Sequence, residues 1–324
     1  MKNGGFGLQS ANIIAGSVGI WRHVEKLSAS RTALATSLMR AVHTRLDPNP
    51  LIDDPWGDRL VPESARDMLR RAALSRLEGD ALKKAMDSPE SVIDQAMLQS
   101  RSYANVITRT RYAEDVLRAA VEKGVQQYVL IGAGFDSFAL RRPPFAAALQ
   151  IFEIDFPATQ LLKLERIAMC GVSLPDSVHF IPADLSQISV AAALARSSFD
   201  PHKLTFFSWL GVTMYLTRDA NIATLSSLAS CSPAGSEVVF TYLDERLFQA
   251  QSESFRELQA RVASMGEPFL SGFNPDSLAA SLVDCGLTLV EDLDGEAVAH
   301  RYDRDGTHGL GQSAFSHIAL ARVT

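Results

Sequence analysis

The sequence predicts an α/β fold, in which a doubly wound, mostly parallel sheet of seven strands follows an N-terminal helical cap. Short apolar runs alternate with helical stretches rich in alanine and leucine over the second two thirds of the chain. Such alternation favours a parallel sheet with helices on both faces. The first hundred residues show helical periodicity alone. They therefore predict a separate layer of helices.

The cap begins with the segment "SRTALATSLMRAVHTRL", residues 30–46. The prolines and aspartates of "DPNPLIDDPWGDRL" interrupt the pattern, and further helices are expected from about residue 62 to residue 87. No glycine linker separates this block from the rest, so residues 28–98 are predicted to form a cap on a single domain, residues 28–324. Apolar residues at spacings of three and four form one face of the first helix: Leu34, Leu38, Ala41, Val42 and Leu46.

A long helix is expected over residues 99–123, because Gly124 follows it in the position that ends many helices. Residues 99–324 are then predicted to form the α/β core, with a helical insertion at about 244–274. The last two strands lie close together in the sequence, which predicts a hairpin at one edge of the sheet. The expected strands are "QYVLIG", "QIFEID", "VHFIP", "LTFFSWL", "SEVVFTYL", "LTLVEDL" and "SAFSHIALARV".

Composition excludes several classes of protein. The chain has 324 residues, 47% of them hydrophobic, and a formal net charge of −6 without a long basic run, so nucleic acid is not an expected partner. No apolar stretch reaches the ~18 residues of a membrane helix. Three cysteines without metal-ligand spacing indicate a reduced, cytoplasmic protein with no metal site. Residues 1–27 are expected to form an arm that is partly disordered.

The first expected strand runs into Gly132, Ala133 and Gly134, in the stretch "YVLIGAGFD". A strand that ends on glycines predicts a ligand-binding turn, because no Cβ keeps the ligand from the backbone. A dinucleotide motif would read Gly-x-Gly-x-x-Gly. Here the third glycine is missing, and Asp136 and Ser137 follow instead. Binding of a pyrophosphate is therefore less favoured.

Acidic residues end the next two expected strands. Asp155 closes "IFEID", where a carboxylate can accept hydrogen bonds from a ribose diol. Asp184 follows the third strand, where it can bond an adenine amino group while Leu185 lies against the ring. A nucleoside without phosphates, bound to an open sheet, indicates S-adenosylmethionine. The alternative is a structural glycine turn with two aspartates that cap helices.

The sequence resembles the leucine carboxyl methyltransferase family, in particular its bacterial branch of polyketide O-methyltransferase-like proteins. The resemblance runs from about residue 28 to residue 234 and implies the class I, Rossmann-like methyltransferase fold with S-adenosyl-L-methionine as cofactor. The segments that carry it are "SRTALATSLMRA", "PLIDDPWGDRLV", "RTRYAEDVL", "QQYVLIGAGFDSFALR", "IFEIDFPATQLLK", "PADL" and "WLGVTMYL".

The resemblance also implies roles for single residues. Arg109 is the best match for the arginine that binds the methionine carboxylate, and Arg31 is a second candidate. Many family members carry a glutamate where this chain has Leu210, which leaves the contact to the cofactor's ammonium group open. The residues expected to bind the cofactor are Arg31, Arg109, Gly132, Ala133, Gly134, Asp136, Asp155, Asp184, Leu185 and Leu210.

The expected partner is a small acceptor molecule with a carboxylate or a hydroxyl group. The resemblance implies O-methylation, and a carboxylate of a small or polyketide-like metabolite is the first expectation. Such a group is already ionised at neutral pH and needs no general base. A hydroxyl or phenol acceptor is the second. The acceptor pocket is expected between the cap and residues 244–274, with Trp56 and Tyr103 as aromatic candidates. No catalytic base can be assigned. A nicotinamide-dependent oxidoreductase and a non-catalytic relative that keeps the fold remain alternatives.

Overall fold

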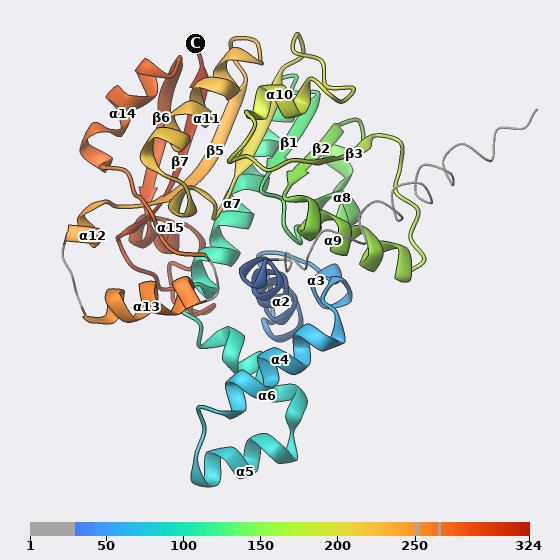
Figure 1. The fold of residues 1–324 in the computed structure, drawn as a ribbon, viewed down its shortest axis with the longest axis vertical. Helices are drawn as coiled ribbons and strands as arrows, with labels where there is room; N and C mark the ends of the chain where they lie inside the picture. Colours follow the sequence, from blue (N-terminus) through green and yellow to red (C-terminus); the bar gives the residue numbers. More distant parts are fainter. Residues whose placement is uncertain (1–29, 250–252, 265–266) are drawn as a thin grey trace, which may run out of the picture.

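The computed structural model describes residues 30–249, 253–264 and 267–324. In this part of the chain one seven-stranded sheet, in the order β3-β2-β1-β4-β5-β7-β6, lies between helices (Figure 1). The strands are β1 (Gln127–Ile131), β2 (Gln150–Asp155), β3 (Val178–Pro182), β4 (Thr205–Trp209), β5 (Glu237–Leu243), β6 (Leu287–Asp294) and β7 (Ser316–Val323).

The first five strands are parallel, as predicted. β1 pairs with β2 on one side and with β4 on the other, so the direction of winding reverses between β1 and β4. β7 is antiparallel and lies between β5 and β6. The last two strands therefore pair at the edge of the sheet, as expected. A helix and a loop connect them, however, so they do not form the tight hairpin that their closeness in sequence suggested.

Helices cover both faces of the sheet. Alternate residues of β1 point to opposite faces, because side chains alternate along a strand. Val129 and Ile131 pack with α10, α11 and α14, whereas Tyr128 and Leu130 pack with α7, α8 and α15. The helices of the core are α7 (Tyr103–Glu122), α8 (Phe138–Arg141), α9 (Pro157–Met169), α10 (Val190–Leu194), α11 (Arg218–Ser230), α14 (Pro275–Asp284) and α15 (Gly295–Tyr302).

The cap is a helical layer at one end of the sheet, below it in Figure 1. Ser30 caps α2 by accepting a hydrogen bond from the backbone N–H of Ala33. The buried face of α2 includes Leu34, Leu38 and Val42, as the sequence pattern predicted, and packs in a third apolar cluster with residues of α7. The cap helices are α2 (Arg31–Leu46), α3 (Trp56–Leu60), α4 (Glu63–Leu74), α5 (Gly79–Asp87) and α6 (Pro89–Leu98).

Two expectations differ from the structure in detail. The long helix α7 begins at Tyr103 rather than near residue 99, because residues 99–102 form turns after α6. In its described residues, 244–249, 253–264 and 267–274, the helical insertion is divided into α12 (Arg246–Gln249) and α13 (Glu253–Ser264) rather than forming one helix, and a bridge joins Asp244 to Phe273. The predicted arm over residues 1–27 lies outside the described residues.

Candidate active site

A cavity of about 580 Å³ opens at the carboxyl ends of β1, β2 and β4. Ligands bind at this edge in open α/β sheets, at the point where the winding reverses. The volume lies in the range of sites for small molecules and cofactors. We call the strand ends and the glycine turn its floor, and the lining residues of α2, Tyr215 and residues 267–270 its roof. Eight of the ten predicted cofactor-binding residues line it: Arg109, Gly132, Ala133, Gly134, Asp136, Asp155, Asp184 and Leu210.

The glycine turn after β1 forms the centre of the floor. The backbone N–H groups of Gly132 and Ala133 donate to the carbonyl of Ile154 in β2, which fixes the start of the turn. Gly134 has a φ of +52°, and a Cβ at this position would lie 3.0 Å from the Cβ of Ala33 in α2. A β-branched residue here would be strained and would also collide with the cap.

Asp155 ends β2 beside the glycine turn. Its Oδ2 accepts a hydrogen bond from the N–H of Gly134, and its Oδ1 accepts one from Phe156 at 2.5 Å. Burial raises the pKa of Asp155, although these two hydrogen bonds act to lower it. Each carboxylate oxygen has a second lone pair. Asp155 can therefore stabilise the turn and still accept hydrogen bonds from a ligand.

The third strand contributes one of its two predicted residues. Asp184 lines the cavity, with Oδ1 accepting hydrogen bonds from the backbone N–H and the hydroxyl of Ser186, at 2.9 and 2.7 Å. Leu185 is not among the lining residues and instead packs against the apolar core. The structure thus brings the carboxylate to the cavity and directs the leucine elsewhere.

Arg109 lies on α7 at the wall of the cavity. Its Nη1 donates to Asn105 Oδ1 at 3.1 Å, and no carboxylate of the described residues lies within ion-pairing distance. Burial lowers the pKa of Arg109 to about 10, so the guanidinium is still charged at neutral pH. Gly211, with a φ of +71°, lets the chain after β4 pass this group, since a Cβ there would lie 2.6 Å from Nη2. The result is a cation that faces the cavity and forms no direct ion pair with a carboxylate of the described residues.

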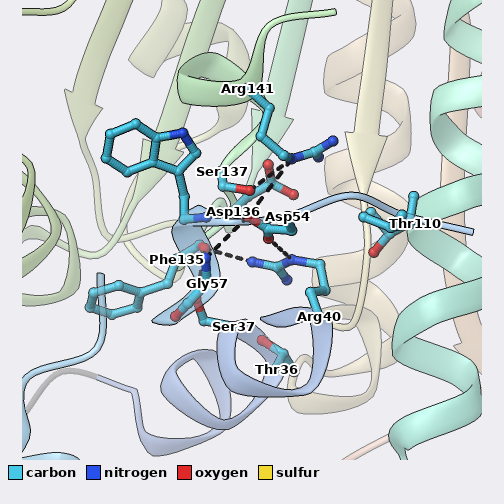
Figure 2. Close-up of polar contacts among 12 residues, drawn as sticks. Thr36, Ser37, Arg40, Asp54, Gly57, Thr110, Phe135, Asp136, Ser137 and Arg141 are labelled. Carbon is cyan, nitrogen blue, oxygen red and sulfur yellow. Dashed lines mark hydrogen bonds and ion pairs between the residues drawn. The ribbon is translucent and has the colours of Figure 1, made fainter. Parts of the chain in front are cut away.

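The two arginines of α2 take different positions. Arg31, the second predicted partner of a carboxylate, is exposed and does not line the cavity. Arg40, which sequence reasoning missed, is buried and lines the cavity. Its Nε pairs with Asp54 at 2.8 Å, and its Nη2 donates to the carbonyl of Phe135 at 2.7 Å (Figure 2). Arg40 lies on the opposite side of α2 from the apolar face of Leu34, Leu38 and Val42, so the periodicity of the helix carried no signal for it.

This buried ion pair lies within the cap, and Arg40 links it to the glycine turn through the carbonyl of Phe135. Asp54 lies between Arg40 and Arg141 in Figure 2, and Arg141 Nη2 also pairs with Glu114 at 2.5 Å. Burial acts to raise the pKa of Asp54, but the two arginines lower it overall. Removing one partner of such a buried pair typically costs 3–5 kcal/mol, because a charge is left uncompensated. The cap is therefore attached firmly to the floor of the cavity.

The roof contains a carboxylate and a tyrosine that were not predicted as site residues. Glu267 lines the cavity and accepts a hydrogen bond from the hydroxyl of Thr32 at the start of α2. Tyr215 also lines it, with its ring centroid 5.6 Å from that of Phe269. The backbone N–H of Leu270 donates to the carbonyl of Met214 at 2.7 Å, which attaches residues 267–270 to the segment after β4.

The expected composition of the acceptor pocket is found in part. Both the cap and the segment after α13 line the cavity, as predicted for residues 244–274. Neither Trp56 nor Tyr103 does so. The Tyr103 hydroxyl instead lies 3.1 Å from Nδ1 of His43 in the cap. In the described ranges no three residues are grouped as metal ligands, and no helix is long and apolar enough to span a membrane.

Several known proteins are similar to this chain in sequence. Residues 33–229 match the family model described as leucine carboxyl methyltransferase. The chain is 33% identical to YktD of Bacillus subtilis (strain 168), over 83% of this chain and 90% of that protein. It is 30% identical to a protein of Mycolicibacterium smegmatis, over 73% of this chain and 75% of the relative. Both are assigned by name to the S-adenosyl-L-methionine-dependent methyltransferases.

Solved structures agree on the fold. A DUF574 family protein from Streptomyces avermitilis covers 92% of this chain and 99% of its own, with a TM-score of 0.56 at 13% identity. A methyltransferase structure from Thermobifida fusca covers 72% of this chain and 88% of its own, with a TM-score of 0.52 at 15% identity. The architecture and the resemblance predicted from the sequence are confirmed, and the chain belongs to the leucine carboxyl methyltransferase family.

Proposed function

We propose that the protein is an S-adenosyl-L-methionine-dependent O-methyltransferase that acts on a small or polyketide-like metabolite. The observation that carries the proposal is the pair formed by Arg109 and Asp155. They supply a cation without a direct ion pair and a carboxylate to one cavity at the carboxyl ends of the strands. The methyl donor needs both, because its methionine part carries a carboxylate and its ribose carries two hydroxyls.

The cavity fits the cofactor group by group. Arg109 binds the methionine carboxylate, in a charge-assisted contact suited to a guanidinium. Asp155 accepts hydrogen bonds from the ribose, and Asp184 accepts one from the adenine amino group. Gly132, Ala133 and Gly134 let the backbone approach the ligand closely, while Leu210 contributes an apolar wall beside Arg109. Asp136 adds a further carboxylate next to the turn.

The bound cofactor supplies an electrophilic methyl group. The protein's contribution is to hold the acceptor oxygen in line with it and to exclude water, which is the effect of proximity and orientation. The roof closes over the floor through Thr32, Glu267 and Tyr215. These side chains line the same cavity as the floor residues and can therefore contact an acceptor bound there.

The first candidate acceptor is a carboxylate, following the resemblance to carboxyl methyltransferases. One observation favours the second candidate, a hydroxyl. Of the two arginines that line the cavity, Arg40 is already paired with Asp54, and Arg109 is assigned to the cofactor. Glu267 would also repel a second carboxylate, whereas it can accept a hydrogen bond from a hydroxyl.

The pH profile of the chemical step separates the two acceptors. A carboxylate is ionised from pH 6 to pH 9, so single-turnover rates should be flat over that range. A hydroxyl or phenol acceptor makes the rate rise with pH until its own pKa, or that of a general base, is passed. A steep, log-linear rise would contradict the carboxylate proposal and support the hydroxyl.

Calorimetric titration separates the proposed function from the two other classes. Binding of S-adenosylmethionine, together with methyl transfer to a component of a metabolite extract, supports the enzyme. Binding of NADH in its place would indicate an oxidoreductase. Binding of the methyl donor without any transfer, across extracts from several sources, would indicate a relative that keeps the fold without catalysis.

A further inference from the structure

The side chains that line the cavity carry an excess of negative charge. Two guanidinium groups, of Arg40 and Arg109, face four carboxylates among the described lining residues. Arg40 is neutralised by Asp54, which is buried outside the cavity. A ligand that fits this cavity therefore gains from a net positive charge. The four carboxylates are those of Asp136, Asp155, Asp184 and Glu267.

Three of these carboxylates are bound to the local backbone, and the fourth is not. Asp136, Asp155 and Asp184 each accept hydrogen bonds from N–H groups near them on the floor. Glu267 is half-buried, and among the described residues it accepts one hydrogen bond, from the neutral hydroxyl of Thr32. The charge of Glu267 therefore has no cationic partner in the described part of the chain, and it acts on the cavity.

Contacts of the cap place Glu267 near the glycine turn. Thr32, which donates to Glu267, is followed by Ala33, and a Cβ on Gly134 would lie 3.0 Å from the Cβ of Ala33. Gly134 in turn donates its N–H to Asp155. Burial raises the pKa of Tyr215 and the charge of Glu267 raises it further, while Arg109 acts in the opposite direction. Burial likewise raises the pKa of Asp155, to which the charge of Glu267 also contributes. Glu267 is thus close enough to influence both the residue beside Arg109 and the residue assigned to the ribose.

The chemistry of the cofactor indicates what a carboxylate at this position can do. In S-adenosylmethionine the sulfonium joins the ribose to the methionine chain, so it lies between the groups assigned to Asp155 and Arg109. Loss of the methyl group converts the sulfonium cation into a neutral thioether, and the rest of the molecule is unchanged. A carboxylate at this point favours the cation over the neutral product.

We propose that Glu267, held over the cavity by Thr32, makes the site selective for the sulfonium form of the cofactor over its demethylated product. The inference rests on the proposed function and deepens it. Binding of the methyl donor is strengthened by a charge that disappears when the methyl group is transferred. The same carboxylate therefore strengthens binding of S-adenosylmethionine without strengthening binding of S-adenosylhomocysteine, so the product is bound less tightly than the donor.

The test is calorimetric titration of S-adenosylmethionine and S-adenosylhomocysteine into the full chain and into Glu267→Gln. Glutamine keeps the size and the hydrogen-bond acceptor for Thr32 and removes only the charge. The Kd of S-adenosylmethionine should rise about tenfold, while that of S-adenosylhomocysteine changes less than about twofold. Glu257→Gln is the matched control, since this residue is exposed on α13. It should leave both constants unchanged.

Two results would overturn the inference. An equal loss of affinity for both ligands would show that Glu267 contacts a group they share, such as the ammonium. Unchanged affinity for both would show that its charge does not reach the ligand. Thr32→Val provides a second variant. It removes the hydrogen bond to Glu267 but keeps the carboxylate, so the preference for S-adenosylmethionine over S-adenosylhomocysteine should fall less than in Glu267→Gln.

The same titrations distinguish this inference from the proposed function. If the unchanged protein binds neither ligand, the proposed function fails and the inference fails with it. If the unchanged protein binds both ligands and Glu267→Gln keeps the same ratio of the two constants, only the inference fails. Circular dichroism spectra of the variants exclude unfolding as the cause of any loss.

Discussion

The floor and the roof of the cavity are built in different ways. The floor consists of strand ends whose polar groups are fixed by the sheet, as when Gly134 donates to Asp155 in the neighbouring strand. The roof joins segments that are far apart in the sequence, as when Thr32 donates to Glu267, 235 residues later. The floor is therefore fixed by contacts within the sheet, whereas the roof depends on contacts between distant segments of the chain.

The largest effect is expected where floor and roof meet. Gly134→Val should abolish binding of S-adenosylmethionine, because valine resists a φ of +52° and its Cβ would press on Ala33 in α2. Titration calorimetry measures the loss. Gly171→Val is the matched control, since Gly171 has a φ of +69° but a Cβ there would meet nothing within 4 Å.

These two variants separate backbone strain from the geometry of the site. Both should lose stability, but only Gly134→Val should lose the ligand. If a folded Gly134→Val variant binds the cofactor as well as the unchanged protein does, the turn is structural and the assignment of the floor is wrong.

The next largest effect is expected for the cation on the wall. Arg109→Leu should weaken the binding of S-adenosylmethionine about a hundredfold, because two charge-assisted hydrogen bonds to the methionine carboxylate are lost. Arg111→Leu is the control, since Arg111 lies two residues further along α7 and pairs with Asp115 at 2.9 Å. Equal affinities in the two variants would contradict the role of Arg109.

A change of pH is expected to have a smaller effect on cofactor affinity, through the carboxylate of Asp155 in the floor. Burial raises the pKa of Asp155 above the usual value of about 3.9 for this side chain. Only the ionised form accepts hydrogen bonds with both oxygens, so affinity is complete above the raised pKa and falls as the pH drops through it. Titrations at a series of pH values should show this loss beginning above pH 4.

Asp155→Asn provides the comparison for that profile. It should bind S-adenosylmethionine about tenfold more weakly at neutral pH, because a charge-assisted hydrogen bond is replaced by a neutral one. Its affinity should also lose the part of the pH dependence that belongs to Asp155. A variant with the same acid profile as the unchanged protein would assign the titration to another group.

The contrast between floor and roof also explains what the sequence could predict. Strand limits, the glycine turn and the carboxylates at residues 155 and 184 follow from local patterns, because parallel strands bring their carboxyl ends to one edge. Leu185 was predicted because it follows Asp184 directly. It packs against the core instead, since the chain turns after Asp184.

The roof lacked a comparable pattern in the sequence. Periodicity predicted that α2 has a buried face, but it did not indicate that Arg40, rather than Arg31, would reach the cavity. Glu267 follows a helical stretch and belongs to no motif. It becomes part of the site through backbone pairing of Leu270 with Met214 and through the hydroxyl of Thr32. Such long-range contacts depend on tertiary packing.

A crystal structure with S-adenosylhomocysteine tests the central claim most directly. We expect the methionine carboxylate at Arg109, the ribose hydroxyls at Asp155 and the adenine amino group at Asp184, with Glu267 facing the sulfur from the roof. A ligand bound away from the carboxyl ends of β1, β2 and β4, or one that reaches neither Arg109 nor Asp155, would contradict the account.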